Sequence, residues 1–218
     1  MNDAPAVEVP VDRAAAQLER GLEALDLRLG REQCAKLLQF LKLLTKWNRV
    51  YNLTAIRNPQ IGVSAHLLDS LAITGYLNGR RILDAGSGAG LPGIPLAIAK
   101  PESEFVLLDS GQKKAAFLRQ ALAELQVKNA SVVCERAETW RPTQQFDCIV
   151  CRALARLAEF VDLTKHLLAP GGVFAAMKGT HPHEEIAQLS VQYHVKQVLP
   201  LEIPGLNALR HLVLIEST

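Results

Sequence analysis

The sequence lacks the features that mark membrane and secreted proteins. It contains no apolar run of membrane length, and we expect no signal peptide at its N-terminus. Only four of its 218 residues are cysteines, and their positions do not form a disulfide framework. A chain of this length needs no such framework, because it buries roughly 70% of its unfolded surface. We therefore expect a cytoplasmic protein with free thiols and no contact with a membrane.

Two of the cysteines form a C-x-x-C pair, a spacing found in metal and redox sites. Cys148 and Cys151 lie in the segment 146–151, FDCIVC, whose composition predicts a strand. Side chains an odd number of positions apart in a strand point to opposite faces of the sheet. We therefore expect no redox pair and no metal site there.

Acidic residues are missing from a long stretch near the N-terminus. The formal net charge of +2 is too small to indicate nucleic-acid binding by itself. Residues 33–68, however, contain five Lys or Arg and no Asp or Glu. In the helix predicted over 31–50, Lys42, Lys46 and Arg49 lie opposite the apolar stripe. This basic face has two interpretations, a solvated helix surface or a contact site for a polyanion.

The rest of the chain is organised around the segment 81–93, RILDAGSGAGLPG. A short apolar run precedes a glycine-rich turn, and an apolar segment from Ile94 to Ala99 follows it. This pattern predicts a strand, a loop and a helix, with Pro92 in the first helical turn. The layout is typical of a nucleotide-binding loop in a doubly wound α/β domain.

The spacing of the glycines indicates which class of ligand this loop binds. A dinucleotide-binding loop requires G-x-G-x-x-G, but position 91 is Leu and the third glycine is Gly90. A Walker loop is excluded because no Gly-Lys-Ser/Thr follows. The pattern Asp84-x-Gly86-x-Gly88-x-Gly90 instead resembles the first motif of S-adenosylmethionine-dependent methyltransferases. That cofactor has no phosphates but carries an amino-acid end and a ribose.

A second acidic residue stands at the distance that a ribose site requires. Asp109 ends the apolar run 105–108 and lies 21 residues beyond Gly88. A carboxylate at the tip of the second strand holds a ribose diol in folds of this kind. Asp109 is also a candidate N-cap for a helix that starts near Gly111. The two roles are compatible, and we expect ribose binding.

The remaining pattern alternates short apolar segments with helical ones. It predicts seven strands, at 81–85, 104–109, 130–134, 147–151, 172–177, 195–199 and 211–216. No helix separates the last two strands, so they should pair antiparallel at one edge. We predict an α/β, Rossmann-like fold of methyltransferase class I, with a seven-stranded, mostly parallel sheet, one antiparallel strand and helices on both faces. The helices of this part are predicted at 92–99, 113–125, 156–168 and 183–189.

The chain divides into three parts on these patterns. Residues 1–10 are expected to be disordered, and residues 79–218 to form the methyltransferase domain. Residues 11–78 are expected to form a helical extension with a possible RNA contact. Its helices are predicted at 11–27, 31–50 and 59–77.

Short motifs along most of the chain resemble those of one family. The most specific is Gly88-Ala89-Gly90-Leu91-Pro92-Gly93-Ile94-Pro95. The others are Trp47-Asn48, Asn52-Leu53-Thr54, His66 with Asp69-Ser70-Leu71, Leu107-Leu108-Asp109-Ser110, Lys114 with Phe117-Leu118, Arg136-Ala137-Glu138, Cys151-Arg152-Ala153, Met177-Lys178-Gly179 and Arg210-His211-Leu212. From about Leu37 onward the chain resembles the bacterial small-subunit (16S) rRNA guanine-N7 methyltransferases, the glucose-inhibited division protein B family.

The resemblance implies a reaction, a cofactor and a partner. The reaction is transfer of a methyl group from S-adenosyl-L-methionine to N7 of a specific guanine in 16S rRNA. The partner is 16S rRNA or the small ribosomal subunit, and we expect a monomer. The implied cofactor-binding residues are Gly86, Gly88, Leu91, Asp109, Ala137, Glu138 and Arg152.

Position in the chain supports two parts of this site. Ala137 and Glu138 follow the third strand, at the carboxyl end of the sheet where ligands bind and where adenine needs an acceptor. Glu138 has an alternative interpretation as an exposed loop charge. Arg152 follows the fourth strand and can pair with the carboxylate of the cofactor. A surface salt bridge is the alternative for Arg152, and both interpretations stay open.

Missing motifs also bear on the methyl acceptor. The chain has no Pro-Cys for attack on cytosine, and Arg152-Ala153-Leu154 stands where amine methylation would require Asp/Asn-Pro-Pro-aromatic. Guanine N7 carries no proton in the neutral base, so we expect no general base and assign no catalytic residue. N7 faces the deep groove of A-form RNA, so the target should be unpaired or splayed out. Arg49, Lys178 and Arg210 are the candidates for RNA contact.

Overall fold

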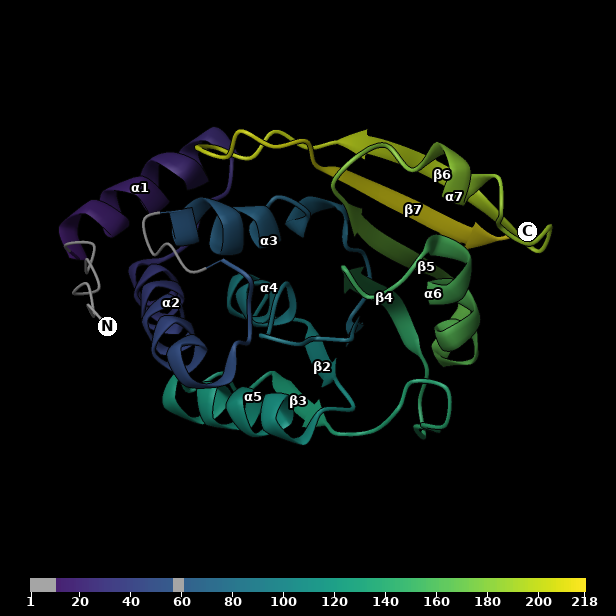
Figure 1. The fold of residues 1–218 in the computed structure, drawn as a ribbon, viewed down its shortest axis with the longest axis horizontal. Helices are drawn as coiled ribbons and strands as arrows, with labels where there is room; N and C mark the ends of the chain where they lie inside the picture. Colours follow the sequence, from purple (N-terminus) through teal and green to yellow (C-terminus); the bar gives the residue numbers. More distant parts are fainter. Residues whose placement is uncertain (1–10, 57–60) are drawn as a thin grey trace, which may run out of the picture.

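The computed structural model of the protein describes residues 11–56 and 61–218 (Figure 1). The expectation of disorder for residues 1–10, and the predicted start of the third helix at Pro59, lie outside the described residues. The helical elements are α1 (Val11–Ala24), α2 (Arg31–Tyr51), η2 (Val63–Leu68), α3 (Asp69–Leu71), η3 (Thr74–Tyr76), α4 (Gly93–Ala99), α5 (Gln112–Glu124), α6 (Leu157–Thr164), η4 (Lys165–Leu167) and α7 (His183–Ile186). The strands are β1 (Arg81–Ala85), β2 (Glu104–Leu108), β3 (Ala130–Val133), β4 (Phe146–Arg152), β5 (Leu168–Lys178), β6 (Tyr193–Pro200) and β7 (His211–Ser217).

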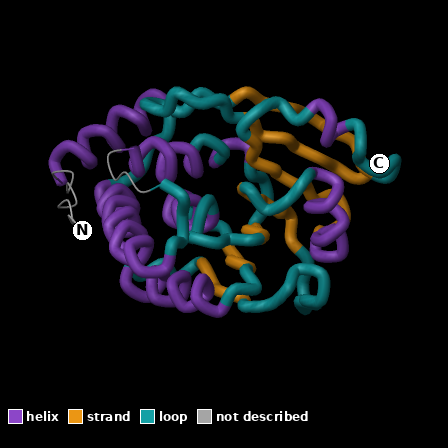
Figure 2. The backbone as a smooth tube through the Cα atoms, in the orientation of Figure 1, coloured by secondary structure: helices purple, strands orange, loops and turns teal. Residues whose placement is uncertain are grey.

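The seven strands form one sheet in the order β3-β2-β1-β4-β5-β7-β6. Strand β7 runs antiparallel to both of its neighbours, β5 and β6, and the other pairs are parallel. The predicted class, with one reversed strand near the edge, is therefore confirmed. Figure 2 shows the strands across the centre and right of the view, with α1 and α2 at the opposite end from the C-terminus.

The predicted elements differ from the observed ones mainly at their ends. Helix α6 ends at Thr164 and continues as the 3-10 turn η4 to Leu167, where helical structure stops because Leu168 already pairs with Phe146 in β5. The long helix predicted over 59–77 is replaced by shorter elements, beginning with the π-helical turn η2. There the N–H of Asp69 reaches the carbonyls of both Ser64 and His66.

Apolar side chains form two cores, one on each face of the sheet. The core shared by α1, α2, α4 and α5 contains Leu18, Leu37, Ile94 and Phe117 together with sheet residues such as Phe105 and Cys148. The other core, under α6, contains Leu157 and Phe160 with Leu83, Phe174 and Cys151. Helices therefore cover both faces, as predicted. The helical extension is buried in the same core as α4 and α5, so it packs directly on the sheet domain.

The two strand cysteines confirm the predicted alternation. Cys148 and Cys151 belong to different cores and are each 2% exposed. Burial raises the pKa of the Cys148 thiol to about 12 and raises that of Cys151 as well. Within residues 11–56 and 61–218, no cluster of His, Cys, Asp and Glu is arranged to hold a metal ion.

Helix α2 presents its apolar stripe to the protein and its basic face to solvent. Leu37, Phe40, Leu41 and Leu44 are buried, and Trp47 packs against Phe117 of α5 with ring centroids 5.3 Å apart. The basic residues opposite the stripe are exposed, namely Lys42, Lys46 and Arg49. No helix in the described part of the chain is long and apolar enough to span a membrane.

Candidate cofactor and RNA site

The loop after β1 has the backbone conformation that its glycines permit. Gly88 has φ of 54°, a left-handed conformation that residues with a Cβ rarely adopt. A Cβ placed there would have Gly86 O as its only near neighbour among the described residues, at 3.7 Å. Gly88 therefore faces open space in which a ligand can approach the backbone. The N–H groups of Gly86 and Ser87 donate to Leu108 O at 2.8 and 3.0 Å, which ties the loop to the end of β2.

Asp84 anchors the other end of this loop from below. Its side chain is fully buried, and Oδ2 accepts the N–H of Gly93 at 3.0 Å, at the start of α4. Pro92 immediately precedes this helix, one position outside the first turn in which it was predicted. Oδ1 has no hydrogen-bond partner among the residues that the structure describes. Burial raises the pKa of Asp84 to about 7, against the opposing effect of the Gly93 hydrogen bond.

Asp109 connects the glycine loop to the start of α5. It is 7% exposed, and its Oδ2 accepts the N–H of Gly88 at 3.0 Å. Its Oδ1 accepts the N–H of Gly111 at 2.8 Å, and Lys114 Nζ lies 3.4 Å from Oδ2. Gly111, not Asp109, occupies the N-cap position of α5. The carboxylate therefore holds two loops together at the carboxyl edge of the sheet, where a ribose diol would be bound.

A cavity of about 390 Å³ opens beside this carboxylate. Four of the seven predicted cofactor-binding residues line it, namely Gly86, Asp109, Ala137 and Glu138. Gly88 adjoins it through its hydrogen bond to Asp109, whereas Leu91 is buried within the loop and is 3% exposed. The lining segments follow β1, β2, β3 and β4, as the switch-point position of ligands in such sheets requires. The remaining lining residues are Leu108, Ser110, Lys114, Glu135, Arg136, Ala153, Leu154, Ala155, Glu159 and Leu163.

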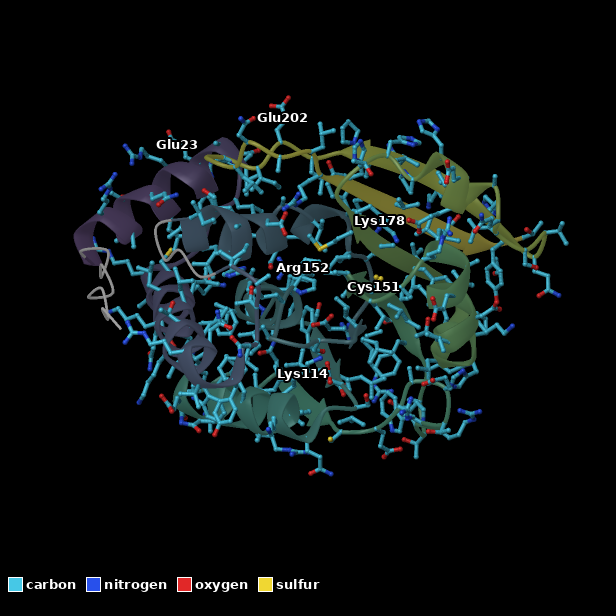
Figure 3. The ribbon with its side chains drawn as sticks, viewed as in Figure 1. Glu23, Lys114, Cys151, Arg152, Lys178 and Glu202 are labelled. Carbon is cyan, nitrogen blue, oxygen red and sulfur yellow. The ribbon has the colours of Figure 1, made fainter. Side chains whose placement is uncertain are left out.

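Arg152, the seventh residue, is paired with the helical extension. Its Nη1 donates to Asp69 Oδ2 at 2.9 Å and lies 3.3 Å from the carbonyl of Ala65. Asp69 Oδ1 accepts Nε of Arg210 at 2.7 Å, so a single carboxylate joins two arginines. The Asp69 side chain is 2% exposed. The ion pair between Arg152 and Asp69 is therefore more buried than the surface salt bridge that the sequence left as the alternative. Figure 3 shows Arg152 near the centre of the molecule.

His66 lies on η2, close to the same cluster. It is 3% exposed, and its Nδ1 has no hydrogen-bond partner within the described part of the chain. Burial, and after it the charge of Arg152, lowers the pKa of His66 to about 4. The imidazole is therefore neutral at physiological pH.

The three candidates for RNA contact differ in their surroundings. Arg49 is exposed on the basic face of α2, and the described residues form no ion pair with it. Lys178 donates to the carbonyl of Ala155 at 2.9 Å and to Glu185 at 2.7 Å. Arg210 donates to Asp69 and to the carbonyl of Leu209. Lysine has three N–H donors and arginine five, so both side chains keep N–H donors beyond these contacts.

Two carboxylates in this region were not assigned roles from the sequence. Asp69 joins Arg152 and Arg210, and Glu185 pairs with Lys178. Asp69 carries a signal, because it is the first acidic residue after the acid-free stretch. Glu185 carries none, since it is one of two adjacent glutamates in a polar segment.

The sheet order, the glycine loop and the cavity together define a class I S-adenosylmethionine-dependent methyltransferase. Solved structures of such enzymes share the fold. The O-methyltransferase TomG from Streptomyces achromogenes, solved in complex with SAM, matches with a TM-score of 0.57 and 18% identity over 97% of this chain and 100% of that chain. The glycopeptide N-methyltransferase MtfA also matches with a TM-score of 0.57, at 15% identity, over 71% of this chain and 96% of its own.

Sequence comparison narrows the class to one family. The GidB family model, described as rRNA small subunit methyltransferase G, matches residues 33–213, and the chain belongs to this family. The ribosomal RNA small subunit methyltransferase G of Nitrosococcus oceani is 53% identical over 196 residues, covering 90% of this chain and 92% of the relative. The protein of the same name from Laribacter hongkongensis is 52% identical over 197 residues, covering 90% and 95%. The resemblance found from the sequence is therefore confirmed.

Proposed function

We propose that this chain transfers a methyl group from S-adenosyl-L-methionine to N7 of a specific guanine in 16S ribosomal RNA. The observation that carries the proposal is the cavity at the carboxyl edge of the sheet, where Gly86, Asp109 and Glu138 meet. The description of the family and the names of its members support rRNA of the small subunit as the substrate.

The residues around the cavity suit the parts of this cofactor. Each carboxylate oxygen has two lone pairs, so Asp109 can accept a ribose hydroxyl while it holds Gly88 and Gly111. Glu138 supplies an acceptor for the adenine amine, beside the backbone of Ala137. Oδ1 of Asp84, which has no hydrogen-bond partner among the described residues, is a buried acceptor under the loop, as a cationic amino group requires. When bound, the cofactor supplies an electrophilic methyl group on a sulfonium.

Further residues would hold the amino-acid end of the cofactor, and others shape the glycine loop after β1. Arg152 has donors beyond its Asp69 contact for a carboxylate. Gly86 and Gly88 allow the backbone to approach the ligand, and Leu91 fixes the course of the loop from its buried position.

Methylation of guanine N7 does not require a protein side chain to transfer a proton. N7 has a lone pair in the ring plane and no proton in the neutral base, so no group must accept a proton. The chain then contributes by orienting the base and excluding water, and positioning of this kind can lower a barrier by roughly 7–11 kcal/mol. We therefore assign no catalytic base, and the neutral His66 is not needed as one.

Positive charge on the surface of α2 supports an RNA substrate. The exposed face of α2 carries Lys42, Lys46 and Arg49 without an acidic neighbour in the stretch 33–68. Neutralising phosphates with such residues releases counterions and makes binding salt-dependent. We propose that Arg49, together with the free donors of Lys178 and Arg210, contacts the RNA backbone near the target.

We also propose that the chain acts as a monomer in the cytoplasm, where small ribosomal subunits are assembled. Analytical ultracentrifugation at several protein concentrations tests the first point. A dimer that persists at nanomolar concentration would contradict it.

Methyl transfer from labelled cofactor tests the proposed reaction. Naked 16S rRNA, the small subunit and the complete ribosome serve as separate substrates, followed by digestion to nucleosides. We expect the label in 7-methylguanosine, and no transfer by a Gly88→Val variant, whose side chain would enter the ligand's space. Label in another nucleoside would contradict the assignment of N7, and tight binding of NAD in place of the cofactor would contradict the class of enzyme.

A further inference from the structure

Glu185 on α7 joins two segments that approach the cofactor cavity from different strands. Its Oε2 accepts the backbone N–H of Leu157 at 2.8 Å and the ammonium of Lys178 at 2.7 Å. Lys178 in turn donates to the carbonyl of Ala155 at 2.9 Å. One carboxylate and one ammonium group therefore hold the chain at Ala155 and at Leu157, the first residue of α6.

The segment held in this way forms one wall of the cavity. Residues Ala153, Leu154 and Ala155 line it together with Asp109 and Glu138 from the neighbouring strand ends. The side chain of Leu154 lies against the glycine loop, because a Cβ at Gly86 would come within 2.5 Å of Leu154 Cδ1. A shift of this segment would therefore change the shape of the cavity.

The backbone of this wall is in a conformation that needs support. Ala153 has φ of 54°, in the left-handed region that alanine seldom occupies. Strained residues of this kind persist when surrounding contacts determine their conformation. Lys178 and Glu185 supply such contacts two and four residues further along the chain, at Ala155 and Leu157.

The pair between Lys178 and Glu185 is better shielded than the ion pairs at the surface. Their side chains are 16% and 22% exposed, whereas those of Lys196 and Glu216 are 53% and 28% exposed. Burial alone would raise the pKa of Glu185, but the hydrogen bonds from Lys178 and from the Leu157 amide outweigh it, and the pKa is lowered. Glu185 is therefore ionised at neutral pH, as the pair requires. Figure 3 labels Lys178 at the end of β5.

We infer that Glu185 is a positioning residue for cofactor binding, which acts through Lys178 and the Leu157 amide to fix the wall formed by residues 153–155. The inference rests on the proposed function, because it takes S-adenosylmethionine as the ligand of this cavity. It gives Lys178 a role at the cofactor site, and its third N–H donor stays available for the substrate.

Calorimetry with S-adenosylhomocysteine tests the inference on the purified full chain without RNA. The variants are Glu185→Gln, Lys178→Met and the double variant. Glu184→Gln is the matched control, because Glu184 is the exposed neighbour on the same helix. Hydrogen bonds to charged groups contribute enough that either single variant should bind roughly tenfold more weakly. The double variant should lose no more affinity for S-adenosylhomocysteine than the single variant that binds it more weakly, because the two side chains act as one unit.

Steady-state kinetics separates positioning from a general loss of structure. Glu185→Gln should raise the KM for the cofactor by roughly tenfold while kcat at saturating cofactor stays within about twofold of wild type. Adding Ala153→Gly to Glu185→Gln should restore part of the affinity, because glycine adopts positive φ without strain. A general loss of folded protein would instead lower kcat, so a change confined to KM marks positioning.

Specific results would overturn the inference. Affinity of Glu185→Gln within about twofold of both the wild type and Glu184→Gln would show that the pair does not position the wall. Strictly additive losses in the double variant would show that Lys178 and Glu185 act separately. If the wild type itself fails to bind S-adenosylhomocysteine, the proposed function fails, and the two failures are thereby distinguished.

Discussion

Replacing Asp69 by alanine removes the carboxylate that joins the helical extension to two arginines of the sheet domain. Arg152 would lose its 2.9 Å contact and keep the carbonyl of Ala65 at 3.3 Å, while Arg210 Nε would lose its 2.7 Å contact. The Asp69 side chain is 2% exposed, but those of Arg152 and Arg210 are 23% and 25% exposed. Both guanidinium groups can therefore regain part of their hydration in the variant.

The size of the effect follows from these contacts. Hydrogen bonds to charged groups contribute about 1.5–3 kcal/mol each, and breaking a buried ion pair destabilises by about 3–5 kcal/mol. Partial solvation of the arginines reduces both figures, so we expect Asp69→Ala to lower the free energy of unfolding by about 3 kcal/mol. In a chain of this length each kcal/mol shifts Tm by about 2–4 °C. The expected fall in Tm is therefore about 6–12 °C.

Urea unfolding followed by circular dichroism measures this change, provided that the slope of free energy against urea is unchanged. Asp162→Ala is the matched control, since Asp162 pairs with Lys165 at the surface and is 65% exposed. The control should unfold as the wild type does, because exposed pairs of this kind contribute little. If Asp69→Ala and Asp162→Ala unfold at the same urea concentration, the reasoning about the bridging carboxylate is wrong.

Three further predictions concern the glycine loop, the basic helix and the buried histidine. Gly88→Ala should abolish binding of S-adenosylhomocysteine, while Gly171→Ala, at another open position with positive φ, should leave it intact. Reversing the charges of Lys42 and Lys46 should weaken rRNA binding and flatten its salt dependence without changing cofactor affinity. His66→Gln should reduce the loss of stability between pH 6.5 and about 4, because the unfolded chain takes up a proton there and the buried imidazole does not.

Controls make each of these predictions decisive. Equal loss of cofactor binding in both glycine variants would point to backbone strain instead of ligand space. Reversal of Lys165 and Lys196, two exposed lysines far from α2 in sequence, should leave the salt dependence as it is. Asp84 has the opposite linkage to His66, because its pKa is raised to about 7 and its stabilising effect is lost as pH rises from about 4 to 7. In His66→Gln the fall in stability with rising pH that Asp84 causes should therefore become visible. An unchanged dependence of stability on pH would contradict the lowered pKa of His66.

The fold and the course of the glycine loop with Asp109 followed from local sequence patterns. The strand 81–85 with its apolar pair Ile82-Leu83, the glycine loop and Asp109 are read from contiguous segments, and the structure places each where the pattern predicted. Such features depend on strand periodicity and on the conformational freedom of glycine, which are properties of short segments. The reversed strand β7 was also predictable, because the segment between it and β6 is too short for a helical crossover.

The partners of the charged residues could not be predicted in this way. Arg152 lies 83 residues from Asp69, and Arg210 lies 141 residues from it, so their pairing depends on how the extension packs on the sheet. The same holds for Glu185, whose contact with Leu157 spans 28 residues. The third predicted helix is helical from 61 to 71, but it is irregular for a related reason. Its apolar pattern suited a regular helix, but the buried segment adopts a π-helical turn in the packed structure.

Arg152 and Lys178, the last residues of β4 and β5, both pair with carboxylates that come from helical segments and not from the sheet. Arg152 pairs in register with Met177, so Lys178 follows at the next position of the neighbouring strand. Asp69 reaches Arg152 from the helical extension, whose helices pack on one face of the sheet, while Glu185 reaches Lys178 from α7 near α6 on the other face. The strands supply the cations, and carboxylates from helical elements outside the sheet orient them. A change in either helical element should therefore alter cofactor or RNA binding while the sheet and the glycine loop stay intact.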